Sequence, residues 1–558
     1  MSDRFSQNRF WLLWVFACLA AVAVLYGWWL EGRPQTVAEA ADDKLQCVSY
    51  APFRKPGETP LDASARVSEE RLREDLGILS ARTQCVRTYS VIQGLDAVPK
   101  VAKSLGMKVY LGVWLGRERD KNEIEINEAI RLANAYPDTV QGVVVGNEVL
   151  LRRELSPAVL AEYIDRVQEG VSGVNVPVTY ADVWEFWSEN TALARHVSFV
   201  TVHILPYWED HPVGIHGAIQ HIVGTAEAMR KLFDGKDVLI GETGWPSAGR
   251  QRDAAVASRV NQARFLREFS QAAAEHNLKY NFIEGFDQPW KRGQEGAMGG
   301  NWGVFDSAGQ AKFPATGPLP EDDGWYWGWV GALVGALLLG ALGRRWGARG
   351  IHLGLPVAMG LVTGALVVAQ GRYLWIWNRN VLEWSTTVVF CVLALVLVLT
   401  VMRLALVGGA APRVGPEGML PARQRAPGVA SLWRSRGQGF GALQLLGLLR
   451  TFFLMAGATM ALLLIFDARY RGFPSVLYAL PVFSLLMAQL AGFRFRGAIE
   501  ERILAGVCLI GCICFVLIEG FENRESLVFA GCLVVMAALA TDGGFWLKRL
   551  DEASPSTR

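Results

Sequence analysis

Two glutamates in this sequence follow short apolar runs of the kind that form buried strands. Glu148 comes directly after residues 143–147, and Glu242 comes directly after residues 238–241. A carboxylate at the end of a buried strand costs desolvation free energy unless it is paired or has a function. Two carboxyl groups that flank one glycosidic bond can break it, because one protonates the leaving oxygen while the other stays ionised and attacks or stabilises the sugar. The pair therefore predicts glycoside chemistry, although either glutamate alone is equally well explained as a helix cap or an ion-pair partner.

Alternating strand-like and helix-like segments surround both glutamates over residues 43–313. Apolar runs typical of buried parallel strands lie at residues 109–113, 142–146, 199–203 and 238–241. Ser68 and Ser156 precede helix-like stretches as expected N-caps. This alternation predicts a (β/α)8 TIM barrel, in which the carboxyl ends of the strands form the active-site face, so both carboxylates would point into one cleft. A doubly wound sheet is the alternative, but no G-x-G-x-x-G sequence follows the first strand.

The composition of the whole chain indicates a membrane protein. Of its 558 residues, 51% are hydrophobic and 19% are charged, whereas soluble domains average about 25% charged residues. The net charge of +2 gives no electrostatic basis for a nucleic-acid partner. Residues 10–30 contain no Asp, Glu, Lys, Arg or His and are long enough to span a bilayer, which predicts a transmembrane anchor after a cytoplasmic N-terminus at residues 1–9. Cleavage of a signal peptide near residues 38–40 is the alternative.

A second membrane region is predicted after the barrel. Following a Pro- and Gly-rich linker at residues 314–323, seven apolar segments predict a multi-pass domain over residues 324–547, embedded in the lipid bilayer. The segments lie near residues 324–342, 351–370, 384–402, 442–466, 474–493, 503–518 and 526–545. Arg450 interrupts the fourth segment. The cores of the others carry almost no ionisable groups, which argues against an ion-coupled carrier.

Arginine is distributed unequally between the loops of this region. The loops after the first, third and fifth segments contain twelve Arg, and the opposite loops contain five. By the positive-inside rule, the Arg-rich loops and the C-terminus at residues 548–558 face the cytoplasm. The same rule, applied to the basic N-terminus, places the barrel on the outer, periplasmic face of the cell inner membrane, with both termini cytoplasmic.

The cysteines give little information about chemistry. Six of the eight lie in apolar segments and are expected to act as small hydrophobic residues. Cys47 and Cys85 precede two candidate neighbouring strands in a compartment that the topology makes oxidising. A disulfide and two buried free thiols both fit these positions. No C-x-x-C sequence or His cluster predicts a metal, and no cofactor is expected.

Several motifs resemble glycoside hydrolase family 17, the β-1,3-glucanases and β-1,3-glucanosyltransferases. Gly146, Asn147 and Glu148 are similar to one family signature, and residues 241–247 (Gly-Glu-Thr-Gly-Trp-Pro-Ser) closely resemble the other. Further matching motifs lie at residues 86–89, 205–208, 286–291 and 301–305. The resemblance covers about residues 47–313 and implies a retaining (β/α)8 barrel. Gln288 departs from the pattern, since fungal-type relatives often have an acid there.

Carried over motif by motif, the resemblance assigns roles to single residues. Glu148 is implied to be the acid/base and Glu242 the nucleophile, while Asn147 hydrogen-bonds the sugar 2-hydroxyl and Tyr207 orients or contacts the nucleophile. The residues expected to bind substrate beside them are Tyr89, Trp208, Trp245, Trp290 and Lys291. Other aromatic residues that suit either sugar stacking or core packing are Tyr50, Trp114, Tyr180, Trp184, Trp187 and Trp302. His203 ends a strand without an evident partner and is expected to be structural.

The arrangement as a whole resembles bacterial membrane proteins of β-1,3/β-1,6-glucan synthesis, which carry a family 17 domain ahead of a membrane region. The resemblance implies a membrane-anchored enzyme that remodels, elongates or branches β-glucan on the periplasmic side. The predicted cytoplasmic loop at about residues 403–440 is far below domain size and no Q-x-x-R-W sequence is present, so a separate glucan synthase is the expected partner. The alternatives are a β-1,3-glucan endohydrolase, and a glucan export channel with the barrel as a binding module.

Overall fold

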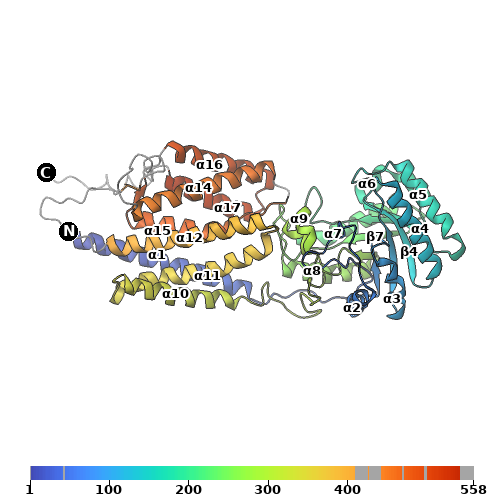
Figure 1. Cartoon of the computed structure of the whole chain (residues 1–558), viewed down its shortest axis with the longest axis horizontal. Helices are drawn as coiled ribbons and strands as arrows, with labels where there is room; N and C mark the ends of the chain where they lie inside the picture. The colour runs from blue at the N-terminus through green and yellow to red at the C-terminus, as the bar shows by residue number, and fades with distance from the viewer. Residues whose placement is uncertain are drawn as a thin grey trace. The chain divides into compact units, whose positions relative to one another are not determined.

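The computed structural model describes residues 2–41, 44–408, 425–426, 441–467, 470–495 and 499–540. The chain divides into two units, which are described separately (Figure 1). One unit is Pro34–Leu319, and the other combines Met1–Arg33 with Pro320–Arg558. Four features of the predicted organisation lie outside the described residues: the boundary at residue 43, the end of the membrane domain at 541–547, the C-terminus at 548–558 and most of the loop at 403–440.

Eight parallel strands close into a barrel in the order of the sequence, which confirms the predicted fold class. The strands are β1 Val48–Ser49, β2 Cys85–Arg87, β3 Lys108–Val113, β4 Val140–Asn147, β5 Val178–Val183, β6 Val200–His203, β7 Val238–Thr243 and β8 Lys279–Phe282. Their runs of Val, Ile and Leu are buried on both faces, as expected for parallel strands covered by helices. The register shifts near the ends of β4, β6 and β7. Irregularities of this kind re-aim side chains next to active sites.

Helices alternate with the strands and cover the barrel. They are α2 Glu69–Ser80, α3 Val98–Ser104, α4 Arg119–Ala135, α5 Pro157–Gly170, α6 Trp184–Glu189, α7 Ile215–Leu232, α8 Arg259–Glu275 and α9 Arg292–Glu295. Ser68 and Ser156 cap α2 and α5 as predicted, because each side chain accepts a hydrogen bond from the backbone N–H three residues later. A cap of this kind satisfies one of the backbone donors that the first helical turn leaves unpaired.

Cys47 and Cys85 form a disulfide that joins the beginnings of β1 and β2. Their Cα atoms are 4.4 Å apart, and the neighbouring Val48 and Val86 are paired in register. Of the two alternatives that the sequence left open, the structure has the disulfide. The bond links β1 to β2, the strand that carries Arg87 at its end.

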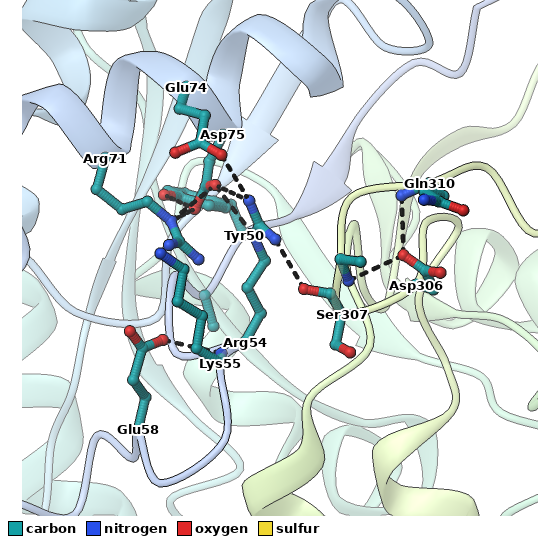
Figure 2. Close-up of polar contacts among 12 residues, drawn as sticks. Tyr50, Arg54, Lys55, Glu58, Arg71, Glu74, Asp75, Asp306, Ser307 and Gln310 are labelled. Carbon is teal, nitrogen blue, oxygen red and sulfur yellow. Dashed lines mark hydrogen bonds and ion pairs between the residues drawn. The ribbon is translucent and has the colours of Figure 1, made fainter.

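A buried ionic network fixes the loop between β1 and α2, as Figure 2 shows. Asp75 accepts hydrogen bonds from Tyr50 (3.0 Å), from Arg54 (2.8 and 3.0 Å) and from Arg71 (2.9 and 3.1 Å). Arg54 also donates to the backbone carbonyl of Ser307 at 2.7 Å, which ties this loop to the segment after β8. The network therefore joins the first and last turns of the barrel around one fully buried carboxylate.

The second unit consists of apolar helices. They are α1 Ser2–Glu31, α10 Tyr326–Arg345, α11 Gly354–Trp377, α12 Val381–Gly408, α14 Ala442–Phe466, α15 Ser475–Leu490, α16 Ile499–Glu519 and α17 Arg524–Ala540. Each of the seven apolar segments predicted after the barrel corresponds to one described helix. Six helices in the described part of the chain, α1 and five after the barrel, are long and apolar enough to cross a membrane, whereas α15 and α17 have 16 and 17 described residues and do not reach that length.

Two contacts within this unit show how its helices pack against one another. Gly331 and Gly364 allow α10 and α11 to meet backbone to backbone, since a Cβ on Gly364 would lie 1.9 Å from the Gly331 carbonyl oxygen. Arg450 of α14 is paired with Glu501, which lies in the first turn of α16. Both side chains are buried, so the interruption in the fourth segment is a paired charge.

The ionic network at Asp75 gives a stability prediction. Asp75→Asn keeps the shape of the side chain but leaves the buried guanidinium of Arg54 and the half-buried guanidinium of Arg71 without their counter-charge, so the free energy of unfolding of the barrel should fall by about 3–5 kcal/mol. The matched control is Glu74→Gln, one residue away, because the Glu74 side chain is 58% exposed and an exposed pair contributes about 0–1 kcal/mol. Urea denaturation of the detergent-solubilised protein, followed by tryptophan fluorescence, measures both. Equal losses in the two variants would contradict the role given to Asp75.

Candidate active site

The two glutamates come together at the carboxyl ends of the strands. Glu148 follows the last residue of β4 and has a positive φ of 52°, and Gly146, two residues earlier, has a φ of 89°. Such conformations are costly for a residue with a side chain and occur where a site requires a particular direction. Glu242 lies in β7, one residue before the strand ends. A carboxylate oxygen of Glu148 and one of Glu242 lie within 4.8 Å of each other.

A buried arginine at the end of β2 connects three strands of the barrel. The Nη1 of Arg87 donates to the carbonyl oxygen of Gly241 at 2.9 Å and to Oε1 of Glu242 at 3.0 Å. Its Nη2 donates to Oδ1 of Asn147. Arg87 was not among the residues predicted to form the site, although Tyr89 of the same motif was. An arginine at the end of a run that becomes a buried strand was the available signal, because a buried charge needs a partner.

His203, expected to be structural, lies in the site. Its Nε2 is 3.1 Å from Oδ1 of Asn147 and 3.6 Å from Oε1 of Glu242. Burial lowers the pKa of His203 to about 4, so the imidazole is neutral at neutral pH and can donate only the proton on one nitrogen. Oδ1 of Asn147 therefore faces donors from Arg87 and His203. This orientation leaves the NH2 group of Asn147 as a hydrogen-bond donor.

Burial and neighbouring charge keep Glu148 protonated at neutral pH. Desolvation is the main cause, and the negative charges of Glu242 and Asp182 add to it, while Arg152 opposes them. Together these effects raise the pKa of Glu148 to about 8. A carboxyl group with such a pKa holds a proton that it can donate near pH 7.

Glu242 shows the opposite behaviour. Burial alone would raise its pKa, but His203, Arg87 and Lys291 and a hydrogen bond from Tyr89 outweigh burial and hold the pKa of Glu242 below its ordinary value. Because His203 is neutral near pH 7, the permanent positive charges of Arg87 and Lys291 carry this effect there. Two carboxyl groups within 4.8 Å thus differ in protonation, one neutral and one ionised. Such a pair can serve as an acid and a nucleophile.

Tyr89 and Lys291, predicted to bind substrate, lie beside Glu242. The ring of Tyr89 is 5.0 Å from the guanidinium carbon of Arg87, and its hydroxyl also donates to the carbonyl of Ile283 at 3.2 Å. Lys291 forms an ion pair with Glu284, a buried acid after β8. The two residues therefore contribute hydrogen bonding and charge around the ionised carboxylate. Their contact with substrate remains a prediction.

The aromatic residues chosen as sugar platforms have different environments. Trp245 is only 1% exposed and its Nε1 donates to the carbonyl of Val256, so its burial argues against a role in stacking on substrate. Tyr207 is also buried, packs edge-on against Trp245, and donates its hydroxyl proton to the carbonyl of Arg250. Trp208 and Trp290 are half-buried. For Tyr207, Trp208 and Trp290 the proposed contacts with nucleophile or substrate remain predictions.

Glu148, His203 and Glu242 also place three candidate metal-ligand atoms within 4.8 Å of one another. The Arg87 guanidinium already occupies Oε1 of Glu242, and a cation at this position would be repelled by it. These contacts favour a carboxylate pair over a metal centre. A cavity of about 590 Å³ lies elsewhere on the barrel, beside the Asp75 network, and is lined by residues between Pro52 and Glu74.

The barrel is similar in sequence to known glycoside hydrolases. Residues 47–303 match the model of the BtgE/BtgC glycoside hydrolase domain. The chain is 27% identical over 258 residues to a glucan 1,3-beta-glucosidase of Arthroderma benhamiae, which covers 43% of this chain and 83% of that protein. It is 27% identical over 300 residues to a putative glucan endo-1,3-beta-glucosidase btgC of Aspergillus niger, with 48% of this chain covered. The match spans 42% of that relative, less than half of its length.

Among solved structures, the chain is similar to the glycoside hydrolase family 17 β-1,3-glucanosyltransferase from Rhizomucor miehei, with 28% sequence identity and a TM-score of 0.43. It covers 49% of this chain and 97% of that chain. The matched model and the closed barrel occupy the same part of the sequence, which contains both Glu148 and Glu242. Residues 47–303 of this chain are therefore a glycoside hydrolase domain that matches the BtgE/BtgC model.

Proposed function

We propose that the barrel is a retaining β-1,3-glucan-active enzyme that transfers glucan chains to sugar acceptors. The observation that carries the proposal is the carboxylate pair, with oxygens within 4.8 Å and pKa values displaced in opposite directions. Retaining glycosidases hold their two carboxyl groups about 5–5.5 Å apart, whereas inverting enzymes need about 6.5–9.5 Å to admit a water molecule. The short separation favours attack by the carboxylate itself. The names of the curated relatives support β-1,3-glucan as the substrate.

In the first step the carboxylate of Glu242 attacks the anomeric carbon while the bond to the leaving oxygen breaks. Glu148 gives its proton to that oxygen, and a glycosyl ester on Glu242 results. Arg87 holds Oε1 of Glu242 at 3.0 Å, which keeps the nucleophile ionised and directed. The free NH2 group of Asn147 is placed to donate to a sugar hydroxyl beside the reacting carbon.

In the second step a hydroxyl group attacks the same carbon from the side of Glu148. Glu148, now ionised, accepts the proton of that hydroxyl, and the ester bond to Glu242 breaks. Water as the acceptor gives hydrolysis, and a sugar hydroxyl gives transfer, with the same two glutamates serving both. A sugar acceptor lengthens or branches the chain. The proposed role is therefore the remodelling, elongation or branching of β-1,3/β-1,6-glucan made by a separate synthase.

The apolar helices support a location of this activity at the membrane. Six described helices are long and apolar enough to cross a membrane, and the Arg bias of the loops favours a periplasmic barrel with both termini cytoplasmic. The Cys47–Cys85 disulfide supports the same orientation, because disulfides persist in oxidising compartments. A membrane-held transferase would act where the polymer emerges from its synthase.

The products of the full-length protein test the transfer proposal. In detergent, with laminari-oligosaccharides as substrate, the wild type should form products longer than the substrate, and their share should rise with substrate concentration because acceptor competes with water. Glu242→Gln should lower the rate by at least about 10³-fold, since the nucleophile is lost. Chromatography with mass spectrometry measures both. Only shorter products at every concentration would overturn transfer in favour of an endohydrolase, and undiminished activity of Glu242→Gln would overturn the site.

A double variant distinguishes a glucan export channel from a glucan-remodelling enzyme. A channel whose barrel only binds glucan would keep exporting it after Glu148→Gln and Glu242→Gln are combined, because both substitutions preserve shape. An enzyme that remodels glucan would keep neither its product distribution nor its linkage pattern. Linkage analysis of glucan from cells that carry the wild type or the double variant distinguishes the two outcomes.

The pH dependence follows from the two carboxyl groups. The first step needs Glu148 protonated, so kcat/KM should decline as the pH rises through about 8, and it needs Glu242 ionised, so kcat/KM should also decline in acid. In Glu242→Gln the negative charge that raises the pKa of Glu148 is absent, and the pKa of Glu148 should fall. Carbon-13 NMR of labelled glutamate in the variant measures that fall. An unchanged or higher pKa would contradict the coupling between the two groups.

The membrane orientation is tested with single cysteines. Ser64→Cys on the exposed loop after β1 should react with a membrane-impermeant maleimide in intact spheroplasts. Arg349→Cys, exposed between α10 and α11, should react only after the membrane is permeabilised. The wild type, whose six free cysteines lie in apolar helices, gives the background. The reverse pattern would invert the proposed topology.

A further inference from the structure

Trp114 is an exposed aromatic residue at the active-site end of the barrel. It directly follows β3, whose last residue Val113 is paired with Val145 of β4, the strand that leads to Glu148. Trp114 is 43% exposed, in contrast to Trp245 at 1%. The guanidinium carbon of Arg152 lies 4.1 Å from the centre of the indole ring. One face of the ring is therefore covered by a cation, and the exposed area belongs to the remainder of the indole.

The backbone around Trp114 is held by buried polar side chains of α4. The N–H of Trp114 donates to Oε2 of Glu125 at 3.4 Å. Gly116, two residues later, donates to Oδ1 of Asn122 at 2.9 Å and accepts from its Nδ2 at 2.8 Å. Glu125 and Asn122 are almost fully buried, at 2% and 1% exposed. Buried polar groups that are fully bonded in this way fix a single backbone conformation, so the exposed indole is presented rigidly.

Arg152 links this platform to the acid/base glutamate. Its backbone N–H donates to the carbonyl of Glu148 at 2.9 Å, and its Nη2 donates to the carbonyl of Leu115 at 2.8 Å. Its positive charge lowers the pKa of Glu148 against the larger effect of burial. The loop between them begins and ends with positive φ angles, 52° at Glu148 and 54° at Arg153. The position of the Trp114 ring and the environment of Glu148 are thus set by the same side chain.

We propose that Trp114 is a stacking platform for the sugar on the leaving-group side of the scissile bond, with Arg152 as its positioning residue. The proposal rests on the assignment of Glu148 as the acid, because the acid contacts the leaving oxygen. The groups around Glu242 come from β2, from β6 and from the segments after β2 and β8, whereas Trp114 is connected to Glu148 through Arg152. A pyranose presents an apolar C–H face that packs on an indole ring, and a rigid ring loses little entropy when it binds.

Two substrates with the same donor sugars test whether Trp114 binds on the leaving-group side of the scissile bond. One is a laminari-oligosaccharide, whose leaving group is a sugar, and the other is an aryl β-laminarioside, whose leaving group is an activated phenol. In the full-length protein in detergent, Trp114→Ala should lower kcat/KM for the oligosaccharide about tenfold and leave kcat/KM for the aryl laminarioside within about twofold. Trp114→Phe should restore part of the loss. The control is Tyr136→Ala, an aromatic residue between α4 and β4 at the other end of the barrel, which should change neither value.

Each other outcome counts against the platform. An equal loss on both substrates would place Trp114 on the donor side, and no loss on either would remove it from the substrate path. A loss that Trp114→Phe does not relieve, together with a lowered unfolding temperature, would make the residue structural. Failure of the wild type to form longer products would overturn the transfer proposal alone, because the ratio of the two kcat/KM values is read equally well from hydrolysis.

Arg152 has a readout that a purely structural role would not move. Arg152→Gln removes the charge that opposes burial at Glu148, so the pKa of Glu148 should rise and the alkaline limb of kcat/KM for the aryl laminarioside should move to higher pH. Arg152→Lys keeps the charge, so the alkaline limb should stay at the same pH. It loses the planar contact with Trp114, so kcat/KM should fall for the oligosaccharide and not for the aryl laminarioside. An alkaline limb that is unchanged in Arg152→Gln would overturn the positioning role.

Discussion

The buried guanidinium of Arg87 is the contact on which the remainder of the site depends. It joins the ends of β2, β4 and β7 by bonding Asn147, the carbonyl of Gly241 and Glu242. A carboxylate in this environment would be protonated without a compensating charge, because burial alone raises the pKa of Glu242. The same charge that keeps Glu242 ionised therefore allows Glu148, within 4.8 Å, to remain neutral, since the negative charge of Glu242 contributes to the raised pKa of Glu148. Geometry and protonation in the site have one common origin.

The barrel and its two glutamates could be predicted because they leave local patterns in the sequence. Strand runs alternate with capped helices, and the polar residue that ends a buried run is visible by itself. Arg87 and His203 could not be found in this way, because their partners are separated from them in the chain: Arg87 meets Glu242 155 residues later, and His203 meets Asn147 56 residues earlier. The choice of aromatic residues that stack on substrate could not be predicted for another reason. Trp245 and Trp114 both follow strands, and only the packing of the folded chain makes one buried and the other exposed.

The apolar helices could be located in the sequence because hydropathy over about 20 residues is itself the physical requirement for spanning a bilayer. Of the seven segments predicted after the barrel, five form helices in the described part of the chain that are long and apolar enough to cross a membrane. What the composition could not supply is the pairing between helices. Arg450 interrupts an apolar segment in the sequence, and its partner Glu501 lies 51 residues later. Placed together on α14 and α16, the two charges satisfy each other through contacts of 2.7 and 3.0 Å, and Thr451 bonds the same carboxylate. Breaking such a pair is costly because one charge would remain buried without its partner.

Whether such an enzyme hydrolyses or transfers is decided after the glycosyl ester has formed, when water and sugar hydroxyls compete for one carbon. By microscopic reversibility the acceptor enters where the leaving group departed, and Glu148 takes back a proton from the group to which it had given one. Any residue that holds the leaving sugar therefore also holds the acceptor. In the proposed arrangement that residue is Trp114, and Arg152 couples its position to the pKa of Glu148. Binding of the acceptor and protonation of the base would then vary together, so the partition between transfer and hydrolysis would be set on the β3–β4 side of the barrel and not at the nucleophile.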